Sequence, residues 1–114
     1  MEMDAAYISI IRKQATEMIE SVSRFSDAIP DEKIYELKLR LIKSLDEFPG
    51  IIEKTLTGEE SNLRNVIKAN VKLGEIKDYL KLADELKYNE TEDLIEKVRT
   101  VSRLITNGYP FLAV

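Results

Sequence analysis

The chain contains no cysteine and no histidine among its 114 residues. Disulfides, thiolate nucleophiles and imidazole ligands are therefore excluded, together with the ordinary zinc motifs and the Ser–His and Cys–His catalytic pairs. A di-iron bundle site needs Glu-x-x-His pairs, which cannot form here. We therefore expect a protein that is not an enzyme and that holds no metal and no cofactor.

Glycine, proline and long apolar runs are scarce. Only 4 glycines and 3 prolines occur, which favours a few long elements. No apolar run approaches the roughly 18–20 residues that a membrane-spanning helix needs, so we expect no membrane association. The segment Met1–Asp4 is acidic, unlike the basic start of a signal peptide. These observations predict a cytoplasmic protein, and the chain length predicts one domain over residues 1–114.

Apolar residues recur at alternating steps of three and four in four segments. The segments cover about residues 4–27, 31–57, 60–87 and 91–107. Such spacing places the apolar side chains on one face of a helix, and no segment alternates with period two as a strand would. Short connections favour antiparallel neighbours. The sequence therefore predicts an all-α, antiparallel up-down-up-down four-helix bundle. The clearest seam consists of Val66, Ala69, Leu73, Ile76, Leu80 and Ala83.

Proline, glycine and capping residues mark the expected ends of these helices. Pro49 interrupts the second segment, but the apolar period resumes after it, which favours a kinked continuous helix over a full break. Gly58 is expected to end this helix. Asn89 and Thr91 are competing caps for the last helix. Gly108 is the expected helix stop, and it leaves residues 108–114 as an apolar tail.

Positive charge is concentrated locally, although the whole chain carries a net charge of −4. A general nucleic-acid binder is usually basic, so such a role requires a local patch. Arg64, Lys68 and Lys72 recur every four residues and predict one exposed ridge, with Lys77 and Lys81 further along the same helix. A ridge of this kind can contact nucleic-acid phosphates. The alternative interpretation is an ordinary solvated helix face.

Two further features indicate contacts with other copies of the chain. Gly74 lies inside a helix, where it costs about 1 kcal/mol relative to alanine, so it indicates either close approach of another helix or a tolerated surface glycine. The tail carries Tyr109, Phe111 and Leu112, which either fold back over the bundle or dock on a partner subunit. We favour docking, and predict an oligomer interface of Gly74 and these three tail residues. Asn70, beside the seam, either hydrogen-bonds across the bundle or faces water.

The order of these signals carries a family resemblance. The turn 29–32, a helix containing Pro49 and a charged loop around Gly58 precede the third helix. That helix contains a characteristic pattern of mostly apolar residues at fixed spacing. The pattern consists of Ala69, Asn70, Val71, Leu73, Ile76, Leu80, Leu82, Ala83 and Leu86. Residues 28–106 resemble a small bacterial four-helix-bundle superfamily. It contains proteins encoded in rRNA intervening sequences and the accessory variability determinant (Avd) proteins of diversity-generating retroelements. The residue pattern of the third helix is closer to the Avd branch, whereas Pro49 and Gly74 resemble the branch encoded in rRNA intervening sequences.

The resemblance implies a role that composition alone does not. Avd proteins form homopentamers, bind a reverse transcriptase and nucleic acid, and have no enzymatic activity of their own. It therefore implies a homopentameric accessory protein that binds a reverse transcriptase, RNA or DNA. Typical Avd proteins are strongly basic, and this acidic chain departs from them. The alternative is a protein–protein interaction module that uses the apolar tail and an acidic surface, without nucleic-acid binding.

Overall fold

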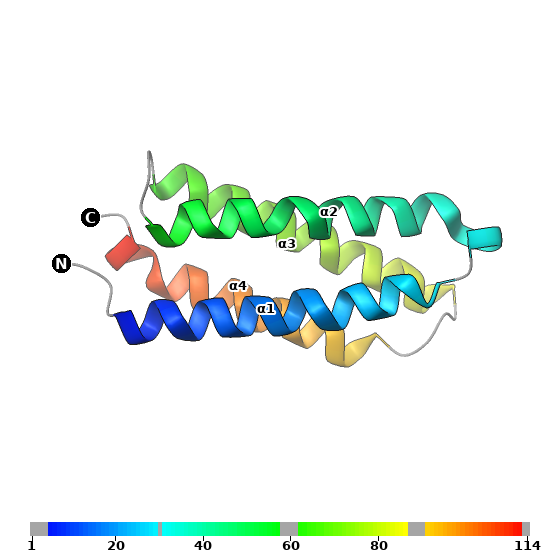
Figure 1. The fold of residues 1–114 in the computed structure, drawn as a ribbon, viewed down its shortest axis with the longest axis horizontal. Coiled ribbons are helices and arrows are strands. Elements are labelled where there is room, and N and C mark those ends of the chain that lie inside the picture. The colour runs from blue at the N-terminus through cyan, green and yellow to red at the C-terminus, as the bar shows by residue number, and fades with distance from the viewer. Residues whose placement is uncertain (1–4, 30, 58–61, 87–90, 113–114) are drawn as a thin grey trace.

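A computed structural model describes residues 5–29, 31–57, 62–86 and 91–112. Its helices are α1 (Ala5–Asp27), α2 (Asp31–Thr57), α3 (Asn62–Glu85) and α4 (Glu92–Leu112). Successive helices run in opposite directions, so α1 begins and α4 ends at the same end of the molecule (Figure 1). The described ranges contain helices and no strand. The predicted all-α, up-down-up-down four-helix bundle is confirmed.

The helices form a four-cornered bundle that measures 50 × 23 × 18 Å. α3 packs against α2 and α4, and α1 packs against the same two helices. α1 and α3 therefore occupy opposite corners. As a consequence, α3 turns one side to α2, a second side to α4 and its remaining side away from the bundle.

The predicted apolar seams meet in one core. All six seam residues of α3 are buried. Met18 on α1, Leu41 and Phe48 on α2, and Ile105 on α4 are fully buried against them. Each such side chain contributes about 1.5–3 kcal/mol relative to remaining in water. Steps of three and four keep these residues on one face of each helix, and burial of that face orders the four helices.

α2 continues through Pro49 without a break, as the kinked-continuous interpretation predicts. Proline lacks an N–H donor and crowds the preceding turn, which costs about 3 kcal/mol inside a helix. Pro49 itself is exposed, whereas Phe48 before it and Ile52 after it are buried. Packing of these flanking residues offsets the cost of the proline. Gly58, the expected stop, lies outside the described residues.

Thr91 holds the turn between α3 and α4. The Ile95 N–H donates to the Thr91 carbonyl at 2.9 Å, which is the first hydrogen bond of α4 and places Thr91 at the N-cap. The buried Thr91 hydroxyl donates to the Leu80 carbonyl on α3 at 3.1 Å. Of the two predicted caps, Thr91 is thus observed at the helix start, and Asn89 lies outside the described residues.

The expected stop of the last helix at Gly108 is wrong, because α4 continues to Leu112. A glycine ends a helix where the backbone turns left-handed, but here Gly108 keeps a helical backbone. It is buried and follows Val101 and Ile105 at steps of four and three, so it extends the packed face of α4. Pro110 is therefore inside a helix and does not follow one.

Candidate functional site

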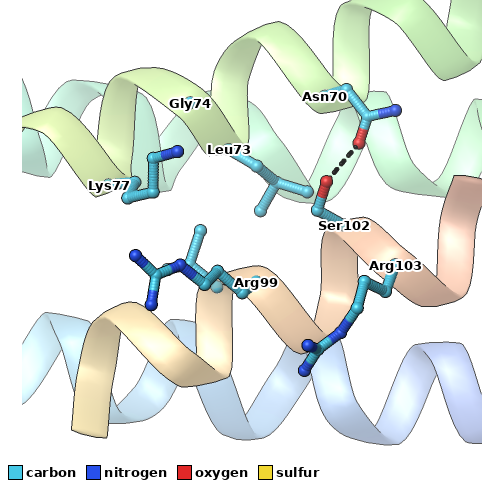
Figure 2. Close-up of a pocket in the computed structure, with 8 residues that line it drawn as sticks. Asn70, Leu73, Gly74, Lys77, Arg99, Ser102 and Arg103 are labelled. Carbon is cyan, nitrogen blue, oxygen red and sulfur yellow. Dashed lines mark hydrogen bonds between the residues drawn. The ribbon is translucent and has the colours of Figure 1, made fainter. Parts of the chain in front are cut away.

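A groove of about 270 Å³ runs between α3 and α4. Leu73 of α3 and Val98 of α4 form its apolar floor, and both are buried. Lys77 of α3 lies on one side of the groove, and Arg99 and Arg103 of α4 lie on the other (Figure 2). The two helices therefore bring three cationic side chains to one open hollow.

Asn70 fastens the two helices at one end of the groove. Its side-chain oxygen accepts a hydrogen bond from the Ser102 hydroxyl at 2.8 Å (Figure 2). Its side-chain nitrogen donates to the Thr106 hydroxyl at 3.2 Å. Of the two interpretations of Asn70, the hydrogen bond across the bundle is confirmed. The two bonds tie α3 to α4 and fix the register of the helices at this position.

Glu96 partly balances the cations of the groove from the preceding turn of α4. Its carboxylate lies 2.8 Å from Arg103 and 3.6 Å from Arg99. The hydrogen bond from Arg103 holds the pKa of Glu96 below its ordinary value. Lys77 has no ion-pair partner within the ranges that the structure describes. Three cations against one carboxylate leave an excess of two positive charges.

The predicted ridge of α3 does not form one surface. Arg64 and Lys68 are exposed, and Lys68 borders a second hollow on the α2 side together with Lys54. Lys77 faces the groove with α4 instead. Lys81 is exposed further along the helix. Cations four residues apart share one side of a helix, but residues 68 and 77 are nine apart and point to different sides.

Lys72 does not belong to an exposed ridge. Its ammonium lies 2.7 Å from Glu47 on α2 and 2.9 Å from Glu75 on α3, and its side chain is only 16% exposed. The hydrogen bond to Glu47 raises the pKa of Lys72, with the bond to Glu75 adding to the effect, and the first bond lowers the pKa of Glu47. Two carboxylates thus neutralise Lys72, which ties α3 to α2.

Sequence reasoning missed Arg99 and Arg103. A signal was present, since these residues stand four apart on the exposed side of α4, with Glu96 before them. The α3 segment carries more cations than the α4 segment, so composition alone favours α3 as the cationic helix. Their relation to Lys77 depends on the packing of two helices and cannot be deduced from either segment alone.

Of the residues predicted to form an oligomer interface, the structure describes Gly74 fully and only the backbone of the three tail residues. A Cβ atom on Gly74 would meet nothing within 4 Å, so no neighbouring helix of the same chain approaches it closely. The close-approach interpretation is therefore wrong within one chain. The side chains of Tyr109, Phe111 and Leu112 lie outside the described residues, and their backbone is the last turn of α4.

The groove offers positive charge and hydrogen-bond donors, which is chemistry for holding an anion. Within the described ranges, the acidic side chains form no cluster of three that could hold a metal ion. No helix in that part of the chain is both long and apolar enough to cross a membrane.

Comparisons with family models, with curated proteins and with solved structures give no match to this chain. The Avd resemblance consequently rests on the residues quoted for it.

Proposed function

We propose that this protein is a non-enzymatic accessory protein that binds the phosphate backbone of a nucleic acid through the groove between α3 and α4. The observation that carries the proposal is that Lys77, Arg99 and Arg103 all line one open hollow. Guanidinium groups suit phosphate because they donate two parallel hydrogen bonds to it.

The shape and charge of the groove support a backbone contact. The hollow is open to solvent and has an apolar floor, and its cations are accessible to a phosphate group. Phosphate contacts need clustered cations and no base-reading geometry. The net charge of the chain is −4, so attraction of a nucleic acid requires a local excess of cations such as the one at this groove.

The resemblance to Avd proteins supplies the biological setting of the proposal. It implies a reverse transcriptase as the protein partner, a nucleic acid as the ligand and a homopentamer as the assembly. A reverse transcriptase gene and a repeated variable gene beside the coding sequence would support this setting. The pentamer stays a prediction.

Binding to labelled single-stranded RNA and to duplex DNA, measured by fluorescence anisotropy at several salt concentrations, tests the proposal. Three phosphate contacts predict that the logarithm of the affinity falls by about 2–3 for each tenfold rise in salt. The triple variant Lys77→Gln, Arg99→Gln, Arg103→Gln should lose at least about tenfold in affinity and most of this salt dependence.

A matched control distinguishes the loss of the groove cations from a change in the net charge of the protein. The triple variant Lys13→Gln, Arg24→Gln, Lys54→Gln removes the same charge from exposed positions on α1 and α2. It should bind nearly as the unaltered protein does. Equal losses in the two triple variants, or no binding at low salt by the unaltered protein, would refute the proposed site.

A further inference from the structure

The hollow between α3 and α4 is larger than a bound phosphate group requires. Its volume is about 270 Å³, whereas one water molecule takes up roughly 30 Å³ of the liquid. A phosphate group occupies the volume of only a few water molecules, so a phosphate held between the cations leaves most of the hollow unfilled. The hollow therefore has room for a second, larger part of a nucleotide.

The unfilled space has apolar walls. Gly74 lines it beside Leu73, and a Cβ atom on this glycine would meet nothing within 4 Å. Lys77 and Arg99 stand on its two sides (Figure 2), and such side chains present methylene stems beneath their charged heads. A phosphate is disfavoured against these walls, because burial of a charge away from its partners costs free energy. A nucleobase suits them, because its two flat faces are largely apolar.

The two arginines of the hollow are held to different degrees. Arg103 donates hydrogen bonds to the Glu96 carboxylate at 2.8 Å and to the Thr100 hydroxyl at 3.3 Å. The ion pair between Arg99 and Glu96 is longer, at 3.6 Å, so the guanidinium of Arg99 is less constrained. A guanidinium plane can stack on the face of a base. Arg103 therefore suits a phosphate, and Arg99 suits the base beside it.

We propose that this hollow takes up one unpaired nucleobase of a single-stranded nucleic acid. The base lies over Gly74 with one face against the Arg99 guanidinium, and Lys77 and Arg103 hold the neighbouring phosphates. Bases inside a duplex are stacked on both faces and have to be unstacked before they can enter a pocket. The protein therefore binds single strands in preference to duplexes. This inference rests on the proposed function, because the same cations hold the phosphates.

Three DNA ligands of equal strand length test the proposal by fluorescence anisotropy at one salt concentration. They are a single strand, the same strand annealed to its complement, and an abasic strand with tetrahydrofuran in place of every nucleoside. The abasic strand keeps the phosphates, so it isolates the contribution of the base. The unaltered protein should bind the normal single strand about tenfold more tightly than either the duplex or the abasic strand.

Two variants locate the base in the hollow. Gly74→Leu fills the space and should weaken binding of the normal single strand by about tenfold, with little effect on the abasic strand. Arg99→Lys keeps the charge but removes the stacking plane, and should weaken the normal strand severalfold more than the abasic strand. Gly50→Leu on α2 is the matched control, since a Cβ there also has free space and Gly50 lies outside this hollow.

The control should bind all three ligands as the unaltered protein does, and circular dichroism establishes that each variant is folded. Equal affinity for the normal and abasic strands would overturn the base pocket and leave the phosphate contact standing. An equal loss on both strands in Gly74→Leu and in Arg99→Lys would do the same. No binding of any of the three ligands at low salt would refute the proposed function, and this inference with it.

Discussion

Lys72 has a different role in the packed bundle from the one that its spacing in the sequence predicts. By spacing alone it belongs with Arg64 and Lys68, and all three form one row of cations. In the bundle, its ammonium is enclosed by Glu47 and Glu75, so it contributes to the joint between α2 and α3 and little to the surface potential. The carboxylate from α2 could not be inferred from the α3 segment.

Replacement of Lys72 by methionine should lower the stability of the bundle at neutral pH and change its pH dependence. Because the fold lowers the pKa of Glu47, this group stabilises the fold above its ordinary pKa, and the stability is lost as the pH falls through the lowered value. The unaltered protein should therefore lose more stability between pH 7 and pH 3 than the variant. Thermal melts at several pH values measure this.

Lys68→Met is the control for Lys72→Met, since Lys68 is exposed one turn earlier on the same helix. Its melting temperature should change little at either pH. A similar pH response in the two variants would show that the ion pairs of Lys72 do not couple protonation to folding.

Gly74→Ala should stabilise the single chain by about 0.5–1 kcal/mol, because alanine restricts the unfolded backbone and its Cβ meets no neighbour within the chain. Urea denaturation at low protein concentration measures the gain. Gly50→Ala on α2 should give a similar gain, since a Cβ there also has free space. Destabilisation by Gly74→Ala would mean that the helix backbone at this position is not regular.

At the scale of one helix, Pro49 inside α2 is the clearest local source of destabilisation. Pro49→Ala should raise the free energy of unfolding by about 1–3 kcal/mol, because it restores a backbone donor and removes the crowding of the preceding turn. Chemical denaturation measures the change, with exposed Asp46→Ala on the same helix as the control. An unchanged stability would indicate that the helix has already relaxed around the proline.

The helices could be predicted where burial and periodicity agree, and less well where local signals stand alone. The six seam residues of α3 have the right spacing and are all buried. Gly108 and Pro110 are ordinary stop signals, yet α4 passes through both, because Gly108 lies on the buried face. A glycine that usually ends a helix therefore does not end it when the glycine lies on the buried apolar face, because packing of that face stabilises the continued helix.

The groove could not be predicted from the sequence as well as the helices could, because its lining residues come from two different helices. Lys77 was singled out from its own segment, whereas Arg99 and Arg103 join it only after α3 and α4 pack. The contact between Asn70 and Ser102 sets the register that brings them together. Sequence periodicity specifies which face of each helix is buried, but it does not specify how far one helix slides along the next.

For the whole molecule, the order of the helices predicts fast folding. Each helix packs against the helix that follows it, and most contacts join residues that are close in the chain. Helical bundles of this kind fold within microseconds to milliseconds. Stopped-flow or temperature-jump measurements should therefore show a single fast phase. A dominant phase of seconds would contradict this expectation, and prolyl isomerisation would be the first cause to examine.

A hydrogen bond between the start of α1 and the later part of α4 allows their separation to be followed by absorbance. The Tyr7 hydroxyl of α1 donates to the Leu104 carbonyl of α4 at 2.7 Å, and burial raises the pKa of this phenol. A phenolate cannot donate, so alkaline titration removes the bond, and its stabilisation is lost as the pH rises above the ordinary value of 10.0. Because the chain lacks tryptophan, phenolate absorbance is not masked by indole. Comparison with Tyr7→Phe isolates this phenol, and its late ionisation marks when α1 separates from α4.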